Sequence, residues 1–176
     1  MNTIPKDNPV SHGKRPILDI PYSRLEVMLE IIAVVGFIVS VIFAAVSWPE
    51  LPDQIPSHFG ASGIPDAWSS KLSIWLLPGI GAGLYVLLTI VSKFPHTFNF
   101  PWAVTEENAE RQYQIGRIMI ISLKAELIWL FAYIEFSTIQ VAMGKSNGLG
   151  KAFLPITLII VFGTIAICLV KGHKTR

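Results

Sequence analysis

Four long apolar segments constrain the fold of this chain more than any other feature of its sequence. They cover residues 27–48, 72–92, 117–143 and 153–170 of a chain of 176 residues. A helix of about 20 mainly apolar residues crosses the hydrocarbon core of a bilayer. In lipid, only helices and closed barrels satisfy every backbone polar group, and these segments lack the alternation of strands. The sequence therefore predicts an all-α membrane protein with four transmembrane helices.

Composition agrees with a membrane protein and speaks against several other classes. Charged residues make up 15% of the chain, whereas a typical soluble domain carries about 25%. The formal net charge of +2 is too small to imply a polyanionic partner. We therefore expect neither a soluble enzyme nor a disordered protein, and we expect the lipid bilayer rather than nucleic acid as the partner.

Lysine and arginine are distributed unevenly between the two ends of the predicted bundle. Of 14 such residues, ten lie in the N-terminal tail, in the loop between the second and third spans or at its edge, and in the C-terminal tail. Because these residues concentrate on the cytoplasmic side, both termini are predicted to be cytoplasmic and the loops at 49–71 and 144–152 to lie outside. Residues 1–22 and 171–176 are then cytoplasmic tails, and residues 23–170 form one membrane domain.

Local signals predict how the helices begin and how they pack. Ser23 and Glu26 have the spacing of a capping box at the start of the first helix. Small residues let helix backbones approach closely in lipid, and such faces also suit a homodimer. They recur at a spacing of four in the first two spans: Gly36, Ser40 and Ala44, then Gly79 and Gly83.

The loop at 49–71 is rich in proline and glycine, so we do not expect it to be helical. Large apolar residues are interleaved with polar ones, which predicts a folded cap on the outer end of the bundle, with Trp68 at the interface. Ser69 or Ser70 is a candidate cap for the second helix. The side chains of this loop that we expect to contact a ligand are His58, Asp53, Asp66, Trp68 and Lys71.

His58 has three open interpretations: protonation, metal binding with Asp53 or Asp66, or a structural hydrogen bond within the loop. A zinc site normally requires three or four well-placed ligands, and one histidine with loosely spaced carboxylates does not meet that requirement. We therefore predict no metal site.

The third apolar segment is unusual because it contains Lys124, Glu126 and Glu135. On insertion scales, a charge at the bilayer centre costs about 2.5–3.5 kcal/mol, so each group requires a partner or a water-filled cavity. Lys124 and Glu30 of the first helix lie at similar depths, which predicts an ion pair between them.

Glu135 lies nearer the outer end of the third segment, within expected reach of His58 or Lys71. The charged groups inside the membrane have two interpretations. They line a polar interior for ligand binding or ion passage, or they form structural pairs with side chains that reach toward the surface. The groups concerned are Glu30, Lys124, Glu126 and Glu135.

Catalytic motifs are missing from the sequence. It contains no His-Glu-x-x-His, no Gly-x-Ser-x-Gly, no phosphate-binding loop and no Gly-x-Gly-x-x-Gly. We therefore predict no catalytic residues and no cofactor, and an enzyme is disfavoured. A membrane-embedded metal-dependent hydrolase that uses His58 and outer carboxylates is a further alternative.

The loop between the first two spans resembles the signature of a bacterial membrane family, domain of unknown function 1648. The residues that carry this resemblance are Leu51, Pro52, Ile55, Pro56, His58, Phe59, Gly63, Pro65, Asp66, Trp68 and Lys71. A looser similarity extends from about residue 20 to residue 160. In that family the module occurs alone or as the N-terminal part of Sdp-type immunity proteins, which protect bacteria against a secreted toxic peptide. The resemblance implies a multi-pass protein of the bacterial plasma (inner) membrane with a role in envelope defence or sensing.

Two hypotheses of function follow. The first is an interaction or sensing module whose outer cap recognises a peptide or another envelope ligand, with Glu135 beneath His58. The second is a small ion-coupled transporter or carrier, dimeric through its small-residue faces, in which Lys124 or Glu135 titrates.

Overall fold

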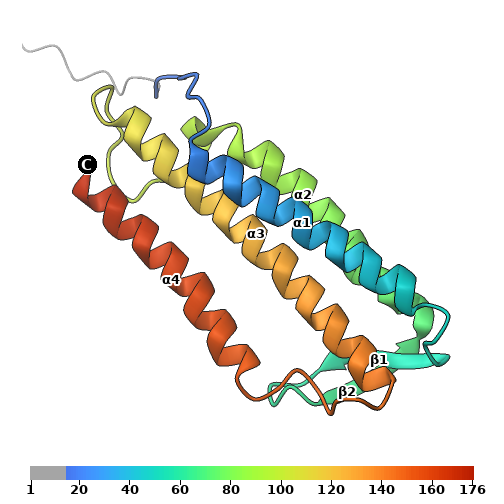
Figure 1. Cartoon of the computed structure of the whole chain (residues 1–176). Helices are drawn as coiled ribbons and strands as arrows, with labels where there is room; N and C mark the ends of the chain where they lie inside the picture. Colours follow the sequence, from blue (N-terminus) through green and yellow to red (C-terminus); the bar gives the residue numbers. More distant parts are fainter. Residues whose placement is uncertain (1–14) are drawn as a thin grey trace, which may run out of the picture.

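The computed structural model describes residues 15–176 and contains four long helices and one small β-hairpin (Figure 1). Residues 1–14 of the predicted tail, with Lys6 and Lys14, lie outside the described residues. The elements follow one another as α1 (Arg24–Ser47), β1 (Gln54–Phe59), β2 (Pro65–Ser70), η1 (Lys71–Trp75), α2 (Leu76–Ser92), η2 (Pro95–Thr97), α3 (Ala109–Ala142) and α4 (Phe153–Lys174).

Three helices of the described chain are long and apolar enough to cross a membrane: Arg24–Ser47, Lys71–Ser92 and Phe153–Lys174. The predicted span at 117–143 corresponds to α3, which ends at Ala142 and is not among them. This helix has 34 residues, so it is about 51 Å long at 1.5 Å per residue. It also begins eight residues before the predicted span, at Ala109.

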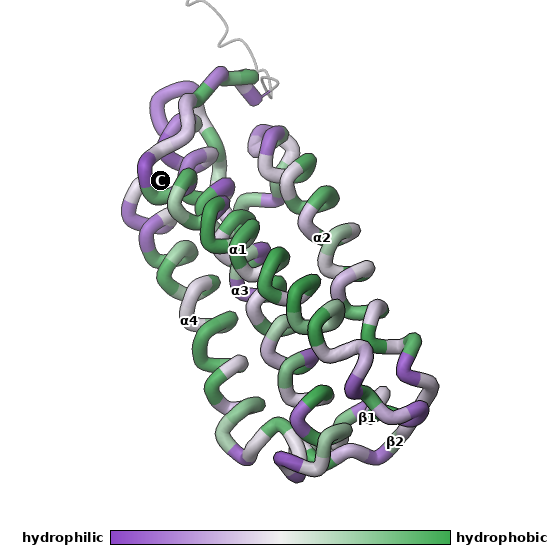
Figure 2. Tube along the Cα trace, turned by 45° about the vertical axis from the view of Figure 1, so that its right-hand side comes forward, coloured by the Kyte–Doolittle hydropathy of each residue, from purple (hydrophilic) through white to green (hydrophobic). Residues whose placement is uncertain are grey.

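α3 is the central element of the bundle. It contacts α1, α2 and α4, and Figure 1 shows it running between α4 and the other two helices. Because neighbours surround it, α3 buries three charged side chains, Arg117, Lys124 and Glu135. In Figure 2 the hydrophilic residues gather mainly at the two ends of the molecule. This arrangement is typical of a protein whose middle lies in lipid.

α1 turns its small residues inward and its large ones outward. Gly36, Ser40 and Ala44 are buried, as the close-packing prediction requires. A Cβ atom at Gly36 would lie 2.9 Å from Nε1 of Trp129 in α3. In α2, however, Gly81 is the glycine that faces α3, whereas nothing lies within 4 Å of a Cβ atom at Gly79 or Gly83. The prediction that Gly79 and Gly83 form a packing face is therefore not met within this chain.

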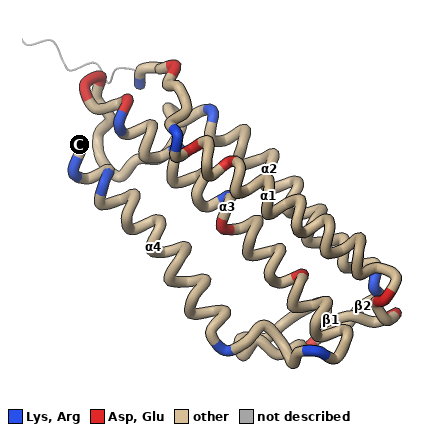
Figure 3. Tube along the Cα trace, viewed as in Figure 1, with Lys and Arg blue, Asp and Glu red and all other residues tan. Residues whose placement is uncertain are grey.

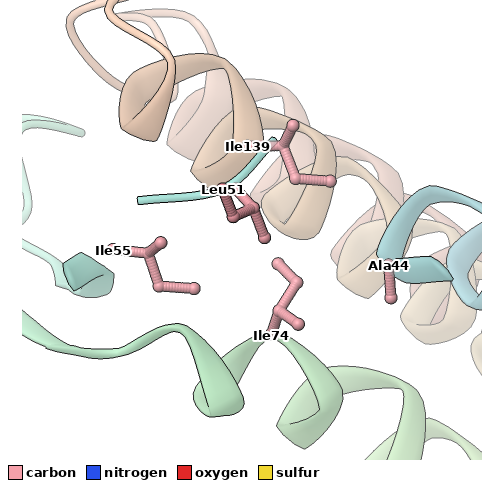
Figure 4. Close-up of a cluster of buried hydrophobic side chains, with 5 residues drawn as sticks. All are labelled: Ala44, Leu51, Ile55, Ile74 and Ile139. Atoms are coloured by element: carbon pink, nitrogen blue, oxygen red, sulfur yellow. The ribbon is translucent and has the colours of Figure 1, made fainter. Parts of the chain in front are cut away.

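The loop at 49–71 corrects the all-α prediction, because it folds as an antiparallel hairpin of β1 and β2. The hairpin turn includes Gly63, whose φ of 76° is easily adopted only by glycine. Beneath the hairpin, apolar side chains from the loop and three helical elements form a core (Figure 4). Its buried members are Ala44, Leu51, Ile55, Ile74 and Ile139. The predicted cap on the end of the bundle is thus present.

Hydrogen bonds at the helix ends match some of the local predictions. The capping box is present, because Glu26 N donates to Ser23 Oγ at 3.3 Å and Ser23 N donates to Glu26 Oε2 at 2.6 Å. Ser70 Oγ accepts a hydrogen bond from Leu72 N at 3.4 Å, so it caps η1, which leads into α2.

The end of the bundle opposite the hairpin is held by a polar cluster around Gln112 of α3. Gln112 Nε2 donates to Gly172 O at 2.9 Å, and Gln112 Oε1 accepts from Trp102 Nε1 at 2.6 Å. Nearby, Tyr113 donates its hydroxyl to Pro16 O at 3.1 Å. Burial raises the pKa of Tyr113 above its ordinary value, so the hydroxyl keeps the proton it donates. The C-terminal end of α4 is therefore fastened to α3.

Candidate functional site

Lys124 is fully buried among three helices, with an exposed fraction of 0%. Its Nζ lies 2.7 Å from both carboxylate oxygens of Glu30 in α1 and 2.8 Å from Oγ1 of Thr89 in α2. The same atom lies 4.6 Å from the ring centroid of Tyr85. The predicted ion pair between Glu30 and Lys124 is therefore present.

A second buried ion pair joins Arg117 of α3 to Glu26 of α1. Arg117 Nε lies 2.5 Å from Glu26 Oε1, and the two terminal nitrogens donate to the carbonyl oxygens of Ile20 and Pro21 at 2.8 and 2.9 Å. The sequence analysis counted Arg117 at the edge of the loop between the second and third spans and assigned it no partner, so it missed this pair. The signal was available, because Glu26 precedes Glu30 by four residues and Arg117 precedes Lys124 by seven, so each pair shares one helix face.

Glu135 has a different partner from the one expected. Ser40 of α1 donates its hydroxyl to Glu135 Oε2, and Glu135 is fully buried between α1 and α3. The predicted contacts with His58 and Lys71 are wrong. His58 pairs with Asp66, and the Nζ of Lys71 lies 5.1 Å from the ring centroid of Trp48. The tight packing of the small α1 residues brings Ser40 close enough to donate this hydrogen bond to the Glu135 carboxylate.

The predicted ligand-binding residues of the loop do not converge on one site. His58 Nδ1 lies 2.5 Å from Asp66 Oδ1 on the exposed side of the hairpin. Asp53 is exposed, and 53% of Trp68 is accessible. Within residues 15–176, no three His, Cys, Asp or Glu side chains are grouped as metal ligands.

A groove lies between α3 and α4, and we call it the α3–α4 groove. Its volume is about 780 Å³. In Figure 1, α4 stands away from α3 along much of its length. Mostly apolar and aromatic residues line this groove: Leu29, Ile32, Ser122, Ala125, Glu126, Trp129, Leu130, Tyr133, Leu149, Gly150, Lys151, Ala152, Phe153, Ile156, Thr157, Ile160, Val161 and Thr164.

Three side chains of the α3–α4 groove donate hydrogen bonds to other parts of the protein. Trp129 Nε1 donates to Ile32 O at 3.0 Å, and Tyr133 donates its hydroxyl to Leu149 O at 2.9 Å. Glu126 Oε1 accepts a hydrogen bond from Thr164 Oγ1 at 2.5 Å. Glu126 Oε2 is also buried, but it has no hydrogen-bond partner among the described residues. In Figure 3 the charged residues of α3 lie along its length, whereas the middle of α4 carries none.

One end of the α3–α4 groove adjoins the hairpin. Tyr133 stacks on Phe153 with ring centroids 5.4 Å apart. Leu149, which accepts the Tyr133 hydrogen bond, donates its own N–H to Gly63 O at 2.8 Å. The groove wall, the loop at 144–152 and the hairpin turn are therefore connected by direct hydrogen bonds. No local sequence signal predicts this groove, because it depends on how far α4 diverges from α3.

Comparisons with known proteins match only part of the chain. The model of the family described as Domain of unknown function (DUF1648) matches residues 35–82, which confirms the predicted resemblance over the second half of α1, the hairpin and the first part of α2. A protein of Archaeoglobus fulgidus, named "Uncharacterized protein", is 26% identical over 68 residues, which cover 34% of this chain and 37% of that protein. No solved structure matches.

Proposed function

We propose that this protein is an interaction or sensing module of the bacterial plasma membrane that binds a lipophilic envelope ligand in the α3–α4 groove. One observation carries the proposal: a mainly apolar groove of about 780 Å³ with a single carboxylate on its wall. Binding sites for small molecules typically have volumes of about 300–1,000 Å³, with apolar walls and a few polar groups. The hairpin residues are then a cap over the ligand site rather than the site itself.

The proposal includes four membrane spans, with α3 as the third. The charges of α3 lower its hydropathy, but Lys124 and Arg117 are neutralised by carboxylates of α1 inside the bundle. A helix whose charges face its neighbours rather than lipid is compatible with a membrane interior. The bias of lysine and arginine supports cytoplasmic termini.

We expect single-cysteine variants to report this topology in intact cells. In a Cys168→Ser background, a membrane-impermeant maleimide should label Ala61→Cys and Lys145→Cys, and it should label Glu106→Cys and Lys174→Cys only after the cells are opened. All four positions are exposed, so accessibility depends on the side of the membrane. Labelling of Lys174→Cys together with protection of Lys145→Cys in intact cells would mean that α3 does not cross.

A ligand in the α3–α4 groove would contact residues that are connected to the hairpin. It would contact Tyr133 and Phe153, and Tyr133 is hydrogen-bonded through Leu149 to the hairpin turn. This connection supports a sensing role. The protective role against a toxic peptide that the family resemblance implies is a narrower form of the same proposal. Transport is less well supported, because that hypothesis requires Lys124 or Glu135 to titrate, and the ammonium group of Lys124 is held by Glu30 and Thr89.

Photo-crosslinking in lipid nanodiscs tests the groove as a ligand site. The probe is an unbranched alkyl chain that carries a diazirine and no polar group. We expect its adducts to concentrate on groove residues such as Ile156 and Ile160, rather than on lipid-facing Ile38 and Val86. Mass spectrometry of the digested protein measures the distribution.

A matched pair of variants provides the control. Ile160 lines the groove, whereas its neighbour Ile159 does not, and 72% of Ile159 is exposed. Ile160→Trp should fill the groove and remove the enrichment, and Ile159→Trp should leave it unchanged. Even labelling of all lipid-facing surfaces in the wild-type protein would contradict the proposal.

A further inference from the structure

We propose that the ligand of the α3–α4 groove is a single-chain amphiphile whose neutral hydrogen-bond donor, a hydroxyl or an amide N–H, binds Oε2 of Glu126. This inference rests on the proposed function, because it requires the groove to be the ligand site. It goes further by naming the chemical class of the ligand and the atom that recognises it.

The unpartnered oxygen of Glu126 is the first argument. Thr164 donates to one carboxylate oxygen, while the other is buried without a donor among residues 15–176. A buried polar atom without a partner costs about 1–3 kcal/mol, and in hydrocarbon no water competes for it. A ligand that supplies a donor at this point gains the hydrogen bond that the protein leaves unmade.

The shape of the groove is the second argument, and it separates a single chain from a peptide helix. The lining residues of α4 run from Phe153 to Thr164, a length of about 16 Å at 1.5 Å per residue. An α-helix of that length with its side chains, about 10–12 Å wide, occupies roughly 1,500 Å³. The groove holds about 780 Å³. An extended hydrocarbon chain therefore lies inside the groove along its length, whereas most of a helix placed against the groove would remain outside it.

The third argument concerns the charge of the donor. Glu126 lies nine residues into the predicted span from Arg117, about 13 Å along the helix axis. Bringing an ammonium group to that depth carries a large desolvation cost, whereas a hydroxyl or amide is far cheaper to bury. The other polar side chains nearby, Trp129 and Tyr133, already donate to backbone carbonyls. Glu126 Oε2 is therefore a buried acceptor without a donor among residues 15–176, on a wall that is mainly apolar.

The test compares three photoactivatable probes of equal length in phosphatidylcholine nanodiscs. They are a diazirine-bearing dodecane, the corresponding dodecanol and the corresponding dodecylamine. We expect the alcohol to label groove residues about tenfold more strongly than the hydrocarbon, as one additional hydrogen bond in an apolar site would produce. The amine should gain less than the alcohol.

Variants of Glu126 assign the effect to this side chain. Glu126→Leu should abolish the preference for the alcohol, whereas Glu126→Gln should retain it, because its amide oxygen still accepts a hydrogen bond. Glu110→Leu removes an exposed carboxylate of the same helix that does not line the groove, and it should change nothing. Should Glu126→Leu fail to fold, the comparison of probes on the wild-type protein remains decisive.

Each result has a distinct meaning. Equal labelling of the groove by hydrocarbon and alcohol would overturn this inference but leave the groove as a ligand site. Stronger labelling by the amine than by the alcohol would contradict the proposal that the ligand's hydrogen-bond donor is neutral. If none of the probes concentrates in the groove, the proposed function fails as well.

Discussion

Replacing Lys124 with leucine is expected to lower the free energy of unfolding by about 3–5 kcal/mol, the usual cost of leaving one member of a buried ion pair alone. Lys124 is fully buried, and its ammonium group is bound by Glu30 and Thr89. The substitution leaves the Glu30 carboxylate in a low-dielectric interior without its cation. Unfolding of the detergent-solubilised protein by increasing sodium dodecyl sulfate, followed by circular dichroism, measures the change.

A double substitution separates the ion pair from simple packing. Lys124→Leu combined with Glu30→Leu removes both charges and should recover most of the lost stability, because paired apolar replacements are often neutral. Lys145→Leu, at an exposed position in the loop after α3, should change stability by less than about 0.5 kcal/mol. A double variant that is as unstable as Lys124→Leu alone would show that the lysine acts through its shape rather than its charge.

Gly148→Ala is expected to destabilise the hairpin cap by about 3 kcal/mol, through overpacking together with the loss of a backbone hydrogen bond. A Cβ atom at this position would lie well under 3.0 Å from the carbonyl oxygen of Gly63. The clashing atom belongs to the backbone, so no change of side-chain rotamer relieves the clash. The next residue, Leu149, donates to the same oxygen, and displacement of the loop would break that bond.

Gly150→Ala is the matched control in the same loop. Gly150 has a φ of 85°, but nothing lies within 4 Å of a Cβ atom there, so backbone strain is its main cost. That strain is about 1–2 kcal/mol. Limited proteolysis of the hairpin should accelerate strongly for Gly148→Ala and only slightly for Gly150→Ala. Similar rates for the two variants would mean that the contact with Gly63 does not hold the cap.

Sequence reasoning succeeded where a feature depends on residues close together in the chain or on their depth along a helix. The capping box at Ser23 depends on residues three apart, and the pairing of Glu30 with Lys124 follows from matching their depths. The partner of Glu135 was wrong because depth alone does not identify which neighbouring helix comes closest. The packing of Gly36, Ser40 and Ala44 against α3 determines which helix is closest. It places the hydroxyl of Ser40, rather than a side chain of the loop, beside Glu135.

The features that escaped prediction depend on tertiary geometry. A loop with four prolines suggested irregular turns, yet β1 and β2 pair across a glycine turn, with a bulge near Pro56 and His58 that accommodates the irregular sequence. Similarly, the apolar pattern of α4 is the same whether it packs closely or diverges from α3. The groove and the role proposed for Glu126 could therefore be identified only from the structure.

The fastening of α4 at its C-terminal end has a mechanical consequence. Gln112 binds Gly172 O at the C-terminal end of this helix, while the α3–α4 groove lies farther toward the hairpin. Along the groove, Thr164 donates to Glu126 and Phe153 stacks on Tyr133, and both contacts depend on the width of the groove. A ligand that widens the groove would therefore break these two contacts and tilt α4 about the Gln112 contact, so the last turn, which carries Lys171 and Lys174, would change its angle to α3 with little translation.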